Sequence, residues 1–319
     1  MMDPRPIAAA LDTALDRAVV PGFSKIGYAV RRRLPTWPAD PAVGALAGRH
    51  VAVTGATSGL GTATARQLSA LGAHVHLIVR NPDKAADVAA DLAGASTTWS
   101  CDLGDLDSVR ACAAEMLAAD VHLDGIVHNA GAMPPQRTES PQGHELSMSL
   151  HVLGPVLLTE LLLPALEGDN ARVVFVTSGG MYTQKLPVDD PDYTRGEYSG
   201  STAYARSKRT QVELLPLLSE RWAAQGIATY VMHPGWAATP GVSDSLPTFD
   251  KVMGPLLRDV DAGADTTTWL IAVQPRPAGG GLWMDRRERP TSFLPKTKPT
   301  SEERKRMWQW TAHALDLTP

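Results

Sequence analysis

The chain has 319 residues, of which 44% are hydrophobic and 20% are charged, so it is long enough to bury a substantial core. Lysine and arginine number 30 against 34 aspartate and glutamate residues, and the net charge of −4 excludes the global positive field that favours nucleic-acid binding. Only 2 cysteines are present, which excludes a disulfide framework and a cysteine-rich metal site and favours a reducing, cytoplasmic setting.

Residues 1–46 precede the first expected strand and form a predicted helical extension. Apolar side chains recur about one helical turn apart along it: Ile7, Leu11, Leu15 and Val19. Three arginines follow at residues 31–33, and two interpretations stay open. Residues 1–41 contact an anionic membrane surface, or they pack on the body of the protein or on a second subunit. Aspartates interrupt the stretch, so it is not expected to be a secretion signal.

The first strand and the turn after it organise the rest of the chain. Val51–Val53 is an apolar run typical of a buried strand, and a GxxxGxG turn leads from it into an expected helix at residues 62–71. Such a turn presents backbone N–H groups and a helix N-terminus to a phosphate. On its own it fits a cofactor site and an ordinary loop equally well. Its candidate cofactor-binding residues are Gly55, Thr57, Ser58, Gly59, Leu60 and Gly61.

Expected strands and helices then alternate along the chain. Strands are expected at residues 75–80, 97–101, 125–128, 172–177 and 227–232, and helices at 82–92, 106–118, 146–166, 207–224 and 261–272. This alternation predicts an α/β fold: a Rossmann-type, doubly wound parallel sheet whose ligand binds at the carboxyl ends of the strands. We expect one catalytic domain at residues 47–280.

Residues with binding chemistry follow three of these strands. Arg80 ends the second strand, where a dinucleotide's adenosine ribose would lie. With Asn81 beside it and no acid before Asp83, it favours a 2′-phosphate, and hence NADP(H), over an ordinary surface arginine. After the third strand, Asp102 would accept a bond from the adenine amine while Leu103 packs on the ring, although aspartate is also a common helix cap. The fourth strand ends in a turn with room for a flat ring: Asn129, Ala130 and Gly131.

Tyr204 and Lys208 carry the strongest chemical signal. Residues four apart share one face of a helix, so the ammonium is expected beside the phenol. A phenol has a pKa of about 10, and a neighbouring ammonium is expected to lower the pKa of Tyr204 into the range for proton transfer. Ser178 follows the fifth strand and would hold a substrate carbonyl oxygen near the phenol. The alternative is a flexible serine–glycine turn.

Three later segments complete the prediction. Residues 234–261 combine proline and glycine with apolar side chains, which suits a substrate lid. The insertion at residues 187–200 is expected to be a solvated acidic loop, because its aspartates lack a calcium-site pattern, and no metal site is predicted. Residues 281–319 are expected to form a C-terminal tail that packs on the domain, through Trp308 and Trp310, while its charge runs RRER and KTKPTSEERKR are expected to be solvated faces.

Together these motifs resemble the short-chain dehydrogenase/reductase family. Six motifs occur in the family's order over about residues 47–275: TGATSGLG, CDL, HNAG, RVVFVTS, YARSK and HPG. The sequence is also similar to that of the retinol-dehydrogenase-like subgroup. The resemblance implies an NADP(H)-dependent enzyme that interconverts a carbonyl and an alcohol on a lipophilic small molecule. Tyr204 would be the general acid/base, Ser178 would position the carbonyl, and Lys208 would also contact the nicotinamide ribose. It further implies that the nicotinamide end is lined by Pro234, Gly235 and Thr239, and it leaves homo-oligomerisation open.

His151 departs from the family pattern. It stands where the family normally has an asparagine that supports a proton-relaying water. His151 would hold this water through its side chain or backbone, or the relay is weakened, or the histidine is structural. This departure and the appended termini leave a second reading open: a cofactor-binding sensor or scaffold with little catalysis.

Overall fold

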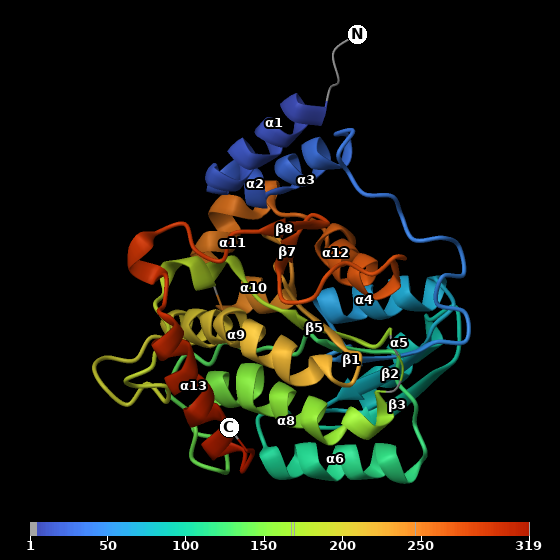
Figure 1. Cartoon of the computed structure of the whole chain (residues 1–319), viewed down its shortest axis with the longest axis vertical. Helices are drawn as coiled ribbons and strands as arrows, with labels where there is room; N and C mark the ends of the chain where they lie inside the picture. The colour runs from blue at the N-terminus through green and yellow to red at the C-terminus, as the bar shows by residue number, and fades with distance from the viewer. Residues whose placement is uncertain (1–4, 167, 169, 246, 319) are drawn as a thin grey trace.

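Strands and helices alternate into one eight-stranded sheet in the computed structural model, which describes residues 5–166, 168, 170–245 and 247–318 (Figure 1). The strands are β1 (His50–Thr54), β2 (His74–Val79), β3 (Ser96–Ser100), β4 (Gly125–His128), β5 (Arg172–Val176), β6 (Ala228–Met232), β7 (Leu282–Met284) and β8 (Arg287–Arg289). Their order is β3-β2-β1-β4-β5-β6-β7-β8. All neighbours pair in parallel except β7 and β8. The predicted doubly wound parallel sheet is confirmed.

Helices cover both faces of this sheet (Figure 1). One face carries α4 (Gly59–Ala70), α5 (Asp83–Ala90) and α12 (Val260–Ala272), and the other carries α6 (Leu106–Ala118), α8 (Gly154–Leu161) and α9 (Gly200–Ala223). The strands are apolar on both sides and β1, β4, β5 and β6 are almost fully buried, as expected for a parallel sheet between two helical layers. The carboxyl ends of the strands remain as the edge where a ligand can bind.

The long helix predicted at residues 146–166 is interrupted. It divides into α7 (Leu146–Met148), a π-helical turn (Ser149–Leu153), α8 and a 3₁₀ turn (Leu163–Ala165). Pro155 accounts for the widened turn, because it has no backbone N–H and its ring would press on the carbonyl of His151, four residues earlier. That carbonyl accepts a hydrogen bond from the Gln211 side chain (2.7 Å) instead.

Helix α9 begins before the predicted start at residue 207. Ser199 caps it, since its hydroxyl accepts a hydrogen bond from the backbone of Thr202 (3.4 Å). The earlier start places both Tyr204 and Lys208 inside one continuous helix.

The N-terminal segment begins with three helices, which lie beside β8 at the top of Figure 1: α1 (Arg5–Arg17), α2 (Val19–Phe23) and α3 (Lys25–Arg32). The apolar stripe predicted for this segment does not face the body. Helix α1 buries Asp12 and Asp16, whereas Ile7 and Leu11 are 68% and 43% exposed. The reason is electrostatic: both carboxylates pair with the buried guanidinium of Arg31, at 2.7 and 2.8 Å.

The charge run RRER at residues 286–289 is not fully solvated as expected, because Arg286 and Arg289 are buried. Residues 282–289 extend the sheet as β7 and β8, beyond the domain boundary predicted at residue 280. Asp285 and Arg286 form the turn between them, with φ of +53° and +55°, the left-handed geometry of a tight hairpin. Charge pairing lets these polar residues enter the interior, because Arg31 and Arg258 hold the Asp285 carboxylate.

Two remaining regions flank the sheet. The lid contains α10 (Pro240–Ser245) and α11 (Pro247–Met253), and the chain ends in α13 (Ser301–Ala314). Trp308 of α13 is buried, with the guanidinium of Arg221 from α9 5.3 Å from its ring centroid. None of the described helices is long and apolar enough to cross a membrane.

Candidate active site

The glycine turn after β1 forms an open cradle at the N-terminus of α4. Gly55 and Gly59 have φ of +64° and +53°, which glycine adopts without strain. A Cβ at Gly61 would overlap the carbonyl of Gly55, so this close helix–strand packing requires glycine. Ser58 makes no side-chain cap to α4. The first N–H groups of this helix therefore lack a side-chain cap, and the cradle fits a phosphate group.

The turn after β4 is tied to this cradle. The hydroxyl of Thr54 accepts hydrogen bonds from the backbone of Asn129 and of Ala130, each at 3.0 Å. The Asn129 side chain donates to the carbonyl of Thr54 (3.1 Å). Ala130 packs so closely that a Cβ at Gly55 would lie 2.7 Å from its Cα. The two turns thus form one rigid surface, with Gly131 exposed at its end.

Arg80, Asn81 and Asp102 lie at the ends of β2 and β3, on the same edge of the sheet. Arg80 is exposed, and within the described part of the chain no hydrogen bond or ion pair occupies its guanidinium. Asn81 accepts a bond from the backbone of Asp83 (3.0 Å) at the start of α5. Asp102 accepts one from the backbone of Gly104 (2.9 Å). Leu103 differs from expectation: it is 3% exposed and belongs to the core cluster around α6 and α8.

Ser178, Tyr204 and Lys208 meet at the ends of β5 and α9. The Lys208 ammonium lies 5.6 Å from the centre of the Tyr204 ring and donates a hydrogen bond to the carbonyl of Val176 (2.8 Å). Thr177 ties the strand to the helix, because its hydroxyl donates to the carbonyl of Lys208 (2.9 Å). The sequence-predicted trio is therefore assembled by direct contacts between β5 and α9.

The pKa of Tyr204 is shifted in the direction opposite to the expected one. Burial raises the pKa of Tyr204, and the neighbouring Ser178 hydroxyl only opposes that rise. Burial also lowers the pKa of Lys208 to about 7. The reason is that both groups leave water together, so the lysine loses part of the charge that was expected to lower the pKa of Tyr204.

His151 packs edge-on against the Tyr204 ring, with centroids 5.2 Å apart. Its Nε2 accepts a hydrogen bond from the backbone of Ala132 (3.2 Å), so its proton is assigned to Nδ1, which donates to Ser207 (2.8 Å). Ser207 donates in turn to the carbonyl of Tyr204 (2.8 Å). Burial lowers the pKa of His151 well below its usual value, so the ring is neutral. Nδ1 and the backbone carbonyl of His151 thus bind residues of α9, and Nε2 binds the loop after β4.

The turn after β6 and the lid close the other side of the site. Gly235 has φ of +73°, and its backbone donates to Nδ1 of the neighbouring His233 (2.8 Å). A Cβ at Gly59 would lie 3.3 Å from the side chain of Thr239, so the lid reaches the glycine cradle. Pro234 is buried beside this turn. The three lid residues expected at the nicotinamide end therefore border the same edge of the sheet.

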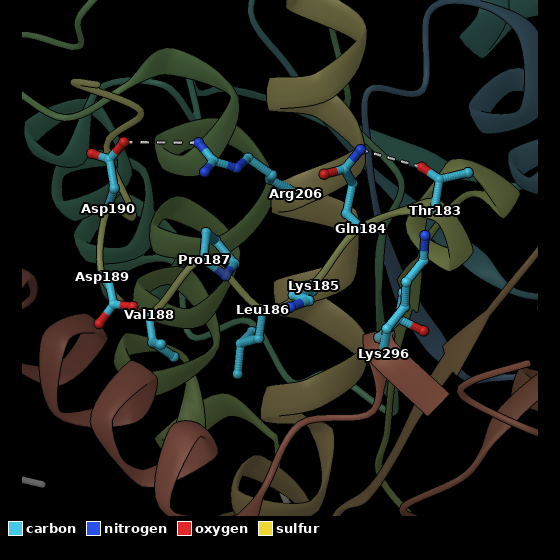
Figure 2. A pocket seen from close by; sticks show the side chains of 11 residues that line it. Thr183, Gln184, Lys185, Leu186, Pro187, Val188, Asp189, Asp190, Arg206 and Lys296 are labelled. Carbon is cyan, nitrogen blue, oxygen red and sulfur yellow. Dashed lines mark hydrogen bonds and ion pairs between the residues drawn. The ribbon is translucent and has the colours of Figure 1, made fainter. Parts of the chain in front are cut away.

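A cavity of about 400 Å³ lies on another side of α9 (Figure 2). It is lined by residues 183–190, Arg206, Lys296 and Thr297, and not by Ser178, Tyr204 or Lys208. Arg206 and Asp190 form an ion pair across it, at 4.0 Å. Its charged lining does not suit a lipophilic substrate. Asp190 also accepts hydrogen bonds from Thr194 and is half-buried, so the acidic loop is more ordered than a solvated one.

Three histidines cluster at the opposite, amino-terminal edge of the sheet. Ring nitrogens of His50, His74 and His76 lie within 4.8 Å of one another. The indole N–H of Trp99 donates to Nδ1 of His76 (3.0 Å), which places the proton of His76 on Nε2, facing Nδ1 of His50 (3.0 Å). Burial lowers the pKa of His76 to about 3. His76 is therefore a neutral ring that binds Trp99 and His50, while Nε2 of His74 bonds the Thr97 hydroxyl (2.9 Å), and we assign no metal to the cluster.

Phe23 is a residue of this site that sequence reasoning did not single out. It comes from the N-terminal segment but packs against His233 and Trp236, with centroids 4.7 and 6.0 Å apart. A Cβ at Gly179, next to Ser178, would lie 3.3 Å from its ring. No local pattern indicates this contact, because it joins residues more than 150 positions apart in the chain.

Comparisons with known proteins agree with this arrangement. The profile of the family described as short chain dehydrogenase matches residues 49–248. The chain is 36% identical over 263 residues to dehydrogenase/reductase SDR family member 12 of Bos taurus, covering 80% of this chain and 81% of the relative. It is 30% identical over 281 residues to human retinol dehydrogenase 12, covering 85% and 88%. A crystal structure of an uncharacterised protein from Mycobacterium paratuberculosis superposes with a TM-score of 0.70 at 28% identity, covering 87% and 96%. The Pseudomonas aeruginosa RhlG/NADP active-site complex shares the fold, with a TM-score of 0.62 at 23% identity over 75% and 95% of the two chains.

Proposed function

The chain belongs to the short-chain dehydrogenase/reductase family of oxidoreductases, and on that premise we propose that it interconverts a lipophilic carbonyl and its alcohol with NADP(H). The predicted family resemblance is confirmed, including its likeness to the retinol dehydrogenases. One observation carries the proposal: Tyr204 and Lys208 share a face of α9 beside Ser178, at the carboxyl edge of a parallel sheet.

The residues present fit a nicotinamide dinucleotide. The uncapped start of α4 and the glycine cradle would hold its phosphates, and the small turn at Asn129–Gly131 would leave room for a ring. The lid residues Pro234, Gly235 and Thr239 would border the nicotinamide end. When bound, the nicotinamide supplies or accepts the hydride.

The chain's own side chains would handle the proton and the carbonyl oxygen. The Ser178 hydroxyl would orient the oxygen, and the Tyr204 phenol would donate or remove the proton there. Lys208, whose pKa is lowered to about 7, would stabilise negative charge developing on the phenol oxygen. His151 would act as a positioning residue, since it reaches the Tyr204 backbone through Ser207.

We expect the protein to bind NADPH more tightly than NADH because of Arg80. The exposed, unoccupied guanidinium would pair with a 2′-phosphate, and a charge-assisted contact of this kind contributes about 1.5–3 kcal/mol. In Arg80→Asp the ratio of the two affinities should fall about 10- to 100-fold. Fluorescence titration with both cofactors measures this ratio.

The control for this titration is Arg110→Asp, which removes another arginine from the surface of α6. Its affinity ratio should match that of the wild type. Tighter NADH binding by the wild type, or an unchanged ratio in Arg80→Asp, would contradict the NADP(H) assignment.

We also propose that the N-terminal segment contacts an anionic membrane surface. Its outward face carries five exposed apolar side chains: Ile7, Leu11, Val19, Val20 and Ile26. Exposed cations flank them at Arg17, Lys25, Arg32 and Arg33. Apolar side chains bordered by positive charge are the pattern of a helix that lies in the interface of an anionic bilayer.

Vesicle co-sedimentation tests this contact. We expect the full chain to sediment with vesicles containing phosphatidylserine more than with phosphatidylcholine alone, and a triple variant with Gln at Ile7, Val20 and Ile26 to lose most of this binding. Leu117→Gln removes an exposed apolar side chain from α6 and should bind as the wild type does. Equal partitioning of wild type and triple variant would rule the contact out.

A further inference from the structure

Phe23 lies at the end of α2, between the lid and the turn after β5 that contains Ser178. Its side chain is buried, at 3% exposure. It contacts three aromatic rings from the catalytic domain: Tyr182, His233 and Trp236, with centroids 6.1, 4.7 and 6.0 Å away. Gly179, next to Ser178, packs closely against this group, since a Cβ there would lie 2.6 Å from Nε2 of His233 and 3.3 Å from the Phe23 ring.

The backbone of Phe23 is also bound to the lid. Its carbonyl accepts hydrogen bonds from the backbone of Trp236 (2.8 Å) and from Nε of Arg258 (3.0 Å). Arg258 pairs with Trp236 and Ala238 through its own backbone, at 2.7 and 2.8 Å. The N-terminal segment and the lid are therefore joined beside the turn that contains Ser178 and Gly179.

From this placement we infer that Phe23 is a specificity-determining residue, which forms with Tyr182 and Trp236 an aromatic wall that limits the bulk of the carbonyl substrate. The inference rests on the proposed function, because Ser178 must be the group that orients the carbonyl. A wall of aromatic rings favours apolar, ring-containing aldehydes and ketones over anionic substrates. The N-terminal segment is then part of the substrate site.

The test compares a small and a bulky aromatic aldehyde, benzaldehyde and 2-naphthaldehyde, with NADPH. Phe23→Ala opens space beside Gly179, so the ratio of kcat/KM for the bulky aldehyde to that for the small one should rise about tenfold or more. Phe23→Trp should lower the ratio, and Phe23→Leu should lie between Ala and the wild type. Phe293→Ala is the control, because Phe293 also contacts Tyr182 (4.5 Å) but comes from the C-terminal tail; its ratio should stay unchanged.

A structural role for Phe23 would give a different result. If Phe23→Ala lowers kcat/KM equally for both aldehydes, together with the melting temperature, the inference is wrong. Calorimetric binding of both aldehydes to the NADP-loaded protein provides the same ratio without turnover. Wild-type protein that binds both aldehydes but reduces neither contradicts the proposed function, while the affinity ratio still decides the role of Phe23. If neither aldehyde binds, the inference is wrong as well.

Discussion

Tyr204→Phe should reduce carbonyl turnover by about 10²- to 10⁴-fold, the usual contribution of a positioned general acid. Phenylalanine keeps the ring that packs on His151 and under Lys208, so the helix and its contacts should persist. What is lost is the phenol hydroxyl, which under the proposed function donates the proton to the carbonyl oxygen. The measurement is the rate of NADPH oxidation with an aromatic aldehyde, alongside NADPH affinity, which should stay nearly unchanged.

The matched control is Tyr193→Phe. Tyr193 lies in the loop before α9, and its hydroxyl donates to the carbonyl of Glu197 (2.9 Å). This variant should retain wild-type turnover. Retained turnover in Tyr204→Phe would remove Tyr204 from its role. A wild-type protein that binds NADPH but turns over no carbonyl would instead favour the sensor or scaffold reading.

The sequence predicts the elements of this site well where the chemistry is local. The glycine turn, Arg80, the Asn129 turn and Ser178 each follow a strand directly, so finding the strand places the residue at the ligand edge. Tyr204 and Lys208 are related by helical spacing alone. These positions could be predicted from the spacing of the apolar residues and from the rule that the carboxyl ends of parallel strands meet at the same edge of the sheet.

The sequence fails where a residue's surroundings come from distant segments. Asp12 and Asp16 look like the solvated side of an amphipathic helix, but their partners Arg31 and Arg289 lie elsewhere in the chain. The wide helical turn at His151 required recognising that Pro155 removes one hydrogen bond. In the same way, the sequence RRER at residues 286–289 looks like a solvated charge run, because the aspartates that pair with its arginines lie in distant segments.

The buried ion pairs around Asp285 join three parts of the molecule. Asp285 belongs to the β7–β8 turn, and its carboxylate binds Arg31 of the N-terminal segment (2.7 Å) and Arg258 at the end of the lid (2.5 and 3.0 Å). The side chains of all three residues are at most 2% exposed. Burial alone would raise the pKa of Asp285, but the charges of Arg258 and Arg31 outweigh it and lower the pKa. The carboxylate is therefore ionised at neutral pH.

Asp285→Asn should lower the free energy of unfolding by about 3–5 kcal/mol, because it leaves two buried guanidinium groups without their shared counter-charge. Asparagine tolerates the left-handed backbone at this turn, so the effect isolates the charge from the conformation. Urea denaturation measures it. Asp91→Asn is the control: Asp91 pairs with Arg66 at the surface, where both side chains are more than half exposed, and its loss should cost less than about 1 kcal/mol.

Wild type and Asp285→Asn should differ in unfolding free energy, and the pH dependence of that difference is an independent check on its electrostatic origin. Because the pKa of Asp285 is lower in the folded protein than its usual 3.8, the stabilisation is complete above that value and is lost as the pH falls through the folded pKa. The difference between wild type and Asp285→Asn should therefore stay constant from neutral pH to about pH 4 and shrink only in stronger acid. An Asp285→Asn protein as stable as the wild type would mean that the two arginines find other partners and that packing alone holds the N-terminal segment over the site.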